Sequence, residues 1–179
     1  ADSVGSAVTV IEREDIQRKQ VRLLSDILRE VPGVALSRGG PVGSLTQVRI
    51  RGAEANQTLV LIDGVEVNDP SGASEFDLST ILADDVQRIE VLRGPQSALY
   101  GSDAIGGVIN IITIKGEGRT SICARVEGGS FNTLNATAGV SGADGAVDYA
   151  LGVSGFRTAG VSAAPKSQGN TERDGYENL

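Results

Sequence analysis

The stretch from Val91 to Thr113, VLRGPQSALYGSDAIGGVINIIT, constrains the fold more than any other part of the chain. Its pattern predicts the end of a strand, a Gly-Pro turn, a short helix and a second strand. The run from Val108 to Ile114 is β-branched and very apolar, which is typical of a strand buried on both faces. Gly101, Gly106 and Gly107 allow backbone conformations and close approaches that other residues do not. The stretch carries no obvious catalytic group, so we interpret it as a packing and docking element.

Up to about Lys115, short predicted strands alternate with short predicted helices. In the most regular helical pattern, Leu24, Ile27, Leu28 and Val31 form one apolar stripe that ends at Pro32-Gly33. No regular strand-helix-strand repeat is present, which indicates an α+β domain covering residues 1–115. Strands are predicted at 6–11, 34–37, 47–51, 58–62, 65–67 and 86–92, and helices at 12–19, 24–31 and 78–82.

The pattern changes at residues 115–119, after which long alternating strands replace the helices. Apolar residues alternate with polar or small ones over 122–127, 134–140 and 147–154, and glycine-rich turns separate the three segments. Strands of this kind, with one apolar face, are typical of an outer-membrane β-barrel. A soluble antiparallel meander is the alternative. Three strands cannot close a barrel without leaving open edges, so we expect residues 116–179 to begin a longer barrel.

Composition excludes several classes of function. A formal charge of −7 argues against a nucleic-acid-binding protein. The chain has no histidine and one cysteine, Cys123, so zinc sites and His-based nucleophilic catalysis have little to build on. No apolar run is long enough for a transmembrane helix. The spacing of Gly101 and Gly106 begins like a phosphate-binding loop, but the required Lys-Ser/Thr is missing. We therefore expect no enzyme activity.

Two arginines stand out because each ends a predicted strand and is followed directly by a glycine. They occur in Ile50-Arg51-Gly52 and Leu92-Arg93-Gly94. Solvated surface arginines are the simpler interpretation. The alternative is that both guanidinium groups meet carboxylates in a partly buried interface, where the planar fork of arginine binds in a bidentate way.

Three separated motifs, at 48–52 (VRIRG), 61–65 (LIDGV) and 93–113, closely resemble the plug domain of TonB-dependent outer-membrane receptors. The resemblance covers residues 4 to 115 and continues into the predicted barrel strands. Among these receptors, the branch that imports vitamin B12 (cobalamin) is the most similar.

The resemblance implies a mixed four-stranded plug with short helices, held inside a barrel of about 22 strands. Such a plug gates an active importer in the outer membrane of a Gram-negative bacterium. TonB, the energy-coupling partner, would pair as a strand with a short box upstream of Ala1. Cobalamin, a metal-siderophore complex, haem or a glycan remain as ligands. A soluble protein-interaction module with an appended β-meander, and a receptor that mainly signals, are the alternative functions.

The resemblance also implies residue roles. Arg51 and Arg93 would face acidic residues of the barrel wall and hold the plug in place. The loops 38–44 and 68–76 match the apical ligand-binding loops of the family. With these loops, the expected ligand contacts are Val42, Leu45, Asn68 and Phe76.

No cofactor is expected in the plug. In the vitamin B12 branch, calcium orders the extracellular loops through clustered aspartates. Glu172 and Asp174 lie at a comparable place in this chain and carry the hard oxygen ligands that calcium prefers. The alternative for this segment is a solvated loop.

Overall fold

Strand β7 (Gly107–Thr113) lies inside the largest sheet, between β6 (Val86–Arg93) and β4 (Thr58–Ile62). The structure is a computed structural model that describes residues 7–71, 73–160 and 174–178. β7 pairs antiparallel with β6 and parallel with β4. Successive residues Val108 and Ile109 point to opposite faces of the sheet, and both are fully buried. The prediction of a strand buried on both faces is confirmed.

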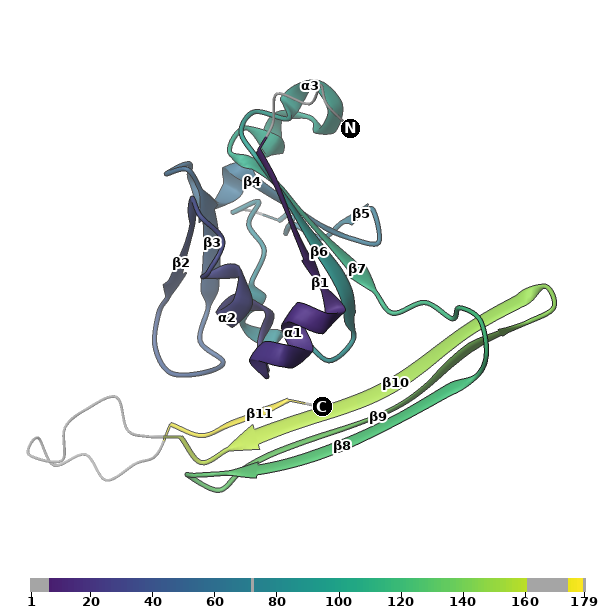
Figure 1. The fold of residues 1–179 in the computed structure, drawn as a ribbon. Helices are drawn as coiled ribbons and strands as arrows, with labels where there is room; N and C mark the ends of the chain where they lie inside the picture. Colours follow the sequence, from purple (N-terminus) through teal and green to yellow (C-terminus); the bar gives the residue numbers. More distant parts are fainter. Residues whose placement is uncertain (1–6, 72, 161–173, 179) are drawn as a thin grey trace, which may run out of the picture. The chain divides into compact units, whose positions relative to one another are not determined.

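The sheet is mixed and has five strands in the order β1-β6-β7-β4-β5, so the expected number of four is wrong (Figure 1). The additional strand has two residues and pairs antiparallel with β4. It forms because Asp63 and Gly64 both have positive φ, 51° and 82°, as in the tight turn that joins neighbouring strands. The two outer strands are β1 (Ala7–Glu12) and β5 (Val65–Glu66).

Two strands and several short helices pack around this sheet. β2 (Val34–Arg38) and β3 (Thr46–Ile50) form a separate two-stranded sheet. The helix predicted over 24–31 is shorter than its apolar stripe. Before Pro32 the α-helical pattern gives way to a tighter 3₁₀-type turn, in which each N–H donates to the carbonyl three residues earlier. These bonds run from Glu30 N to Ile27 O and from Val31 N to Leu28 O. The helices are α1 (Arg13–Lys19), α2 (Leu24–Leu28), α3 (Ser97–Tyr100), η1 (Ala55–Gln57), η2 (Leu78–Thr80) and η3 (Ser102–Ala104).

The main hydrophobic core joins one face of the sheet to α1, α2 and β3. Ile89 and Ile109 of the sheet pack in the same cluster as Leu24 and Leu28 of α2 and Ile50 of β3. A smaller cluster on the other face includes Val108 and Ala104, so η3 covers part of that face. Burial on both faces explains why β7 has no polar alternation.

Gly107 allows β7 to pack closely against its neighbours. Its φ is 154°, and a Cβ added there would overlap the carbonyl oxygen of Leu92 and lie 2.9 Å from Cδ1 of Ile50. A larger residue would push β7 away from β6 or from the core, so the close packing at the start of β7 requires glycine.

Residue contacts divide the chain into two units, which are described separately. The first comprises Ala1–Ser37 and Leu45–Thr113, and the second comprises Arg38–Ser44 and Ile114–Leu179.

The second unit contains an antiparallel sheet in the order β11-β10-β9-β8. Three of its strands are long, which confirms the three alternating strands expected from the sequence, and the short β11 adds the start of a fourth (Figure 1). The strands are β8 (Ser121–Gly129), β9 (Thr133–Asp144), β10 (Val147–Thr158) and β11 (Tyr176–Asn178).

Within the parts of the chain that the structure describes, no helix has the length and apolar character needed to cross a membrane.

Candidate functional site

The two arginines singled out from the sequence lie beside each other in the first unit. A Cβ added to Gly33 would lie 3.7 Å from both Cγ of Arg51 and Cδ of Arg93, so the two side chains flank the same glycine. Arg93 donates hydrogen bonds from Nη1 to the carbonyl oxygen of Pro32 (2.7 Å) and from Nη2 to Oγ1 of Thr9 (3.0 Å). These bonds hold its guanidinium between β1 and the turn at Pro32.

The sequence predicted that Arg51 would be the last residue of a strand. In the structure β3 ends at Ile50, and Arg51 is the next residue. Its φ of 53° and the φ of 78° at Gly52 turn the chain sharply after β3. The Arg51 N–H donates to the carbonyl oxygen of Gly33 at 2.7 Å. Its guanidinium reaches Gly94, the residue that follows β6, because a Cβ on Gly94 would lie 3.1 Å from Nη1 of Arg51.

Among the described residues, no carboxylate lies within ion-pair distance of either guanidinium. Arg51 is exposed and Arg93 is half-buried. Like charges on neighbouring side chains repel each other, and an anion bound beside them reduces that repulsion. The pair can therefore accept a carboxylate from outside the described residues.

The first loop expected to contact ligand, residues 38–44, connects β2 to β3. Val42 lies in this loop and is half-buried, whereas Leu45, just before β3, is exposed. An exposed leucine at the end of a strand is available to contact another molecule.

The second such loop is held from inside by Asn68, which is 8% exposed. Its Oδ1 accepts from the N–H of Val60 at 2.8 Å, and its Nδ2 donates to the carbonyl oxygens of Thr58 (3.1 Å) and Ser74 (2.9 Å). The amide thus takes the place of a neighbouring strand along β4 and joins β4 to the loop. Phe76, in the same loop, packs against the main core. Both side chains are engaged with the interior of the first unit, and their role as ligand contacts stays a prediction.

Two acidic residues that the sequence analysis missed tie this loop to β3. Nε2 of Gln47 donates to both carboxylate oxygens of Glu75, at 2.9 and 2.7 Å. Oδ1 of Asp77 accepts from the N–H of Thr46 and from the N–H of Ser79, both at 2.9 Å. The sequence carries a signal for one of them, because Asp77 and Ser79 have the spacing of a helix cap. Gln47 and Glu75 are 28 positions apart and meet through tertiary folding.

Asp69 lies at the exposed tip of the same loop. Its Oδ1 accepts from the N–H (2.8 Å) and the hydroxyl (2.7 Å) of Ser71. These two hydrogen bonds, the side-chain one first, stabilise the carboxylate and lower the pKa of Asp69 below its usual value.

The expected calcium ligands stay a prediction. Glu172 lies outside the described residues, and Asp174 is half-buried just before β11. In the part of the chain that the structure describes, no group of three Asp, Glu, His or Cys side chains is arranged to hold a metal ion.

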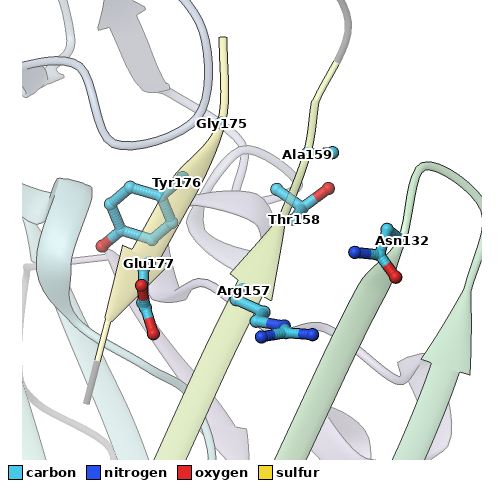
Figure 2. A pocket seen from close by; sticks show the side chains of 7 residues that line it. All are labelled: Asn132, Arg157, Thr158, Ala159, Gly175, Tyr176 and Glu177. Carbon is cyan, nitrogen blue, oxygen red and sulfur yellow. The ribbon is translucent and has the colours of Figure 1, made fainter. Parts of the chain in front are cut away.

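A shallow pocket of about 390 Å³ lies where β10 and β11 meet the turn between β8 and β9. Arg157 and Glu177 are directly opposite each other on β10 and β11, as are Thr158 and Tyr176. Figure 2 shows the guanidinium of Arg157 between the side chains of Glu177 and Asn132. The pocket is lined by Asn132, Arg157, Thr158, Ala159, Gly175, Tyr176 and Glu177.

Comparison with known proteins identifies the family. Residues 1–108 match the family model described as the TonB-dependent Receptor Plug Domain. Because this match covers more than half of the chain, the protein belongs to the TonB-dependent receptor plug family.

Solved structures with a similar fold are receptors. The siderophore receptor PirA from Acinetobacter baumannii is 31% identical with a TM-score of 0.66, covering 86% of this chain and 25% of that one. The R480A mutant of the ferric enterobactin receptor PfeA from Pseudomonas aeruginosa, in complex with enterobactin, is 30% identical with a TM-score of 0.66, covering 87% and 25%. The siderophore receptor PiuA from A. baumannii is 26% identical with a TM-score of 0.71, covering 86% and 21%.

This chain therefore spans about a quarter of the length of the solved receptors that it matches. These structures are siderophore receptors, so the comparisons do not support the narrower assignment to the vitamin B12 branch.

Proposed function

We propose that this chain is the plug and the first barrel strands of an outer-membrane active importer that takes up ferric siderophores. The observation that carries the proposal is the direct continuation of a TonB-dependent receptor plug into three long antiparallel strands. In this assignment residues 1–115 occlude the barrel and residues 116–179 begin its wall. The plug gates transport, needs no cofactor and catalyses no covalent reaction, and TonB supplies the energy.

The loops 38–44 and 68–76 have different roles in this proposal. Val42 and Leu45 contact the ligand, which fits the exposure of Leu45. Asn68 and Phe76 hold the second loop in place, because both are engaged with the interior of the first unit. Calcium at Glu172 and Asp174 remains a prediction.

Arg51 and Arg93 hold the plug in the barrel by binding acidic residues of the barrel wall. Support comes from two arginine side chains that flank Gly33 and whose guanidinium groups lack a carboxylate partner among the described residues. Charge-assisted, bidentate hydrogen bonds are among the stronger ones in proteins, and they form and break without unfolding either partner. Such contacts suit a plug that must be fixed at rest and move during transport.

The plug also carries an exposed apolar segment that this arrangement would cover. Leu99 and Tyr100 of α3 and Ile105 after η3 are all exposed. Large apolar side chains grouped on a surface mark a contact with another protein surface or a membrane. The inner wall of the barrel is the partner that the proposal supplies.

Uptake by the full-length receptor tests the proposal. The receptor is expressed in a Gram-negative bacterium that lacks its own siderophore receptors, in strains with and without TonB. Accumulation of radioactive iron is measured with ferric enterobactin and other ferric siderophores, and cobalamin uptake is measured in parallel. We expect TonB-dependent iron uptake. Cobalamin uptake in the absence of iron uptake would refute the siderophore assignment.

Leakage tests the role of the arginines. In the full-length receptor, Arg93→Gln removes the charge but keeps hydrogen-bonding capacity, and it should allow assembly while loosening the plug. We expect increased entry of a large antibiotic or dye through the outer membrane, with a further increase when Arg51→Gln is added. The matched control is Arg29→Gln, in the first unit but outside the pair. Unchanged leakage and unchanged hydrogen exchange of the plug would contradict the assignment.

A further inference from the structure

One face of the sheet formed by the three long strands is apolar in each row of cross-strand neighbours. Pairing places Ile122 opposite Val140 and Val140 opposite Leu151, and the next row on this face contains Ala124, Ala138 and Val153. Leu151 is 74% exposed and Ile122 is 80% exposed. We call the side of β8–β10 that carries these residues the apolar face.

The opposite side carries the polar residues of the same strands. Arg125 lies opposite Thr137, and Thr137 lies opposite Ser154. A soluble sheet would turn this polar face to water and bury the apolar one. In the second unit the apolar side chains are the more exposed, so their partner must itself be apolar.

The apolar face has a defined height. Along β10 it runs from Val147, through Tyr149, whose hydroxyl is within hydrogen-bond distance of Oγ1 of Thr120 (2.5 Å), to Arg157. Strands that cross a bilayer use about 9–11 residues, and aromatic residues are enriched at the membrane interfaces. The segment between Tyr149 and Arg157 therefore has the length of a membrane-crossing strand, with Arg157 at one boundary.

Arg157 lies on the same side of β10 as the apolar face, but its side chain is charged. The strand alternation places it on the same side as Leu151 and Val153, whereas Thr158 belongs to the polar side. Arg157 is exposed, and no described residue accepts a hydrogen bond or forms an ion pair with its guanidinium. Its cross-strand neighbour Glu177 and the nearby Asn132 line the same pocket (Figure 2).

We propose that Arg157, with Asn132 beside it, binds the phosphate group of a lipid headgroup at the rim of the membrane. The planar guanidinium matches phosphate geometry, and Asn132 supplies a further amide donor. An arginine at the end of an apolar face reaches the headgroup layer while its aliphatic stem remains in contact with the acyl chains. The proposal rests on the proposed function, because it requires the strands to lie in the outer membrane.

Native mass spectrometry of the full-length receptor tests this inference. The receptor is purified in detergent and titrated with lipid A, with dephosphorylated lipid A and with inorganic phosphate. We expect retention of lipid A but not of the dephosphorylated lipid, and little effect of inorganic phosphate, which lacks the acyl chains. Arg157→Gln should weaken lipid A binding about tenfold, since charge-assisted hydrogen bonds are lost, and Arg157→Lys should restore part of it.

Arg125→Gln, on the polar face of β8, is the matched control and should leave lipid A binding unchanged. Equal losses with Arg125→Gln and Arg157→Gln, or no loss with Arg157→Gln in a correctly assembled receptor, would overturn the inference. So would dimerisation of the receptor that depends on Arg157, because a second copy would then occupy the site. Siderophore uptake is measured on the same variants. If the unmodified receptor binds lipid A but takes up no ferric siderophore, the transport proposal is refuted and the lipid-binding inference is not.

Discussion

The two units of the chain use the same alternation of apolar and polar residues in opposite ways. In β6, Ile89 and Val91 are fully buried, whereas the alternating residues Arg88 and Glu90 are partly accessible and form an ion pair with each other. In β10, Leu151 and Val153 are the exposed residues. The first unit buries its apolar side chains within itself, as a protein in water does. The second unit presents them outward, which fits a surrounding of lipid.

The comparison teaches that alternation specifies a two-faced strand but not the medium that each face meets. β7, with little alternation, is buried on both faces because the main core covers one side and η3 covers part of the other. β8–β10 have no second layer among the described residues of their unit. Substitutions at equivalent residue types in the two units should therefore have different consequences.

The largest effect is expected for Ile109→Ala in the plug. Ile109 is fully buried in the main core, and truncation of a buried isoleucine costs about 2–5 kcal/mol. Hydrogen exchange of β6 and β7 in the full-length receptor should accelerate accordingly. Ile122→Ala, at an isoleucine that is 80% exposed on β8, is the control and should leave plug exchange unchanged. Equal acceleration by both variants would remove the distinction between the units.

A charge on the apolar face comes next. Val153→Arg places a cation near the middle of the segment between Tyr149 and Arg157, where it should cost about 2–4 kcal/mol in a membrane. Ala150→Arg puts the same charge on the polar side of β10 and should cost much less. The free energy of unfolding of the full-length receptor in lipid vesicles measures both. If Ala150→Arg proves the more harmful, the two faces have been assigned the wrong way round.

A smaller effect is expected for Asn68→Ala. The substitution leaves the N–H of Val60 and the carbonyl of Thr58 without the amide that now bonds them, at a cost of about 1–3 kcal/mol. We expect faster hydrogen exchange over residues 68–77 and weaker siderophore binding with little change in β6. Asn56→Ala, at an exposed position of η1, is the control. Normal exchange in the loop of the Asn68 variant would show that other contacts suffice to hold it.

The smallest effect concerns Asp69, whose pKa is lowered by Ser71. A lowered pKa means that the folded loop favours the carboxylate, so this stabilisation is present above the ordinary pKa of aspartate and is lost as the pH falls through the lowered value. Ser71→Ala should return the pKa of Asp69 toward its usual value. Hydrogen exchange of the loop at several acidic pH values measures the shift, and identical pH profiles for both proteins would contradict it.

The sequence alone determined most of the secondary structure. The Val108–Ile114 run predicted the buried strand β7, and the alternation after residue 120 predicted β8–β10, because side-chain periodicity and β-branching report directly on burial. Asp63-Gly64 predicted the turn between β4 and β5, because this residue pair favours the positive φ angles that the turn requires. The motifs around Arg51 and Arg93 were sufficient to suggest the plug family, which the family match over residues 1–108 confirms.

Tertiary structure decided the roles of individual side chains. Asn68 reaches back to β4, Gln47 meets Glu75 across 28 positions, and Arg51 lies beside Arg93 around Gly33. None of these contacts follows from local pattern, because each depends on how separate strands and loops are brought together. Strand pairing likewise decided that Arg157 shares a face with Leu151 and lies opposite Glu177. Local chemistry thus specified the elements, and long-range packing specified what their side chains touch.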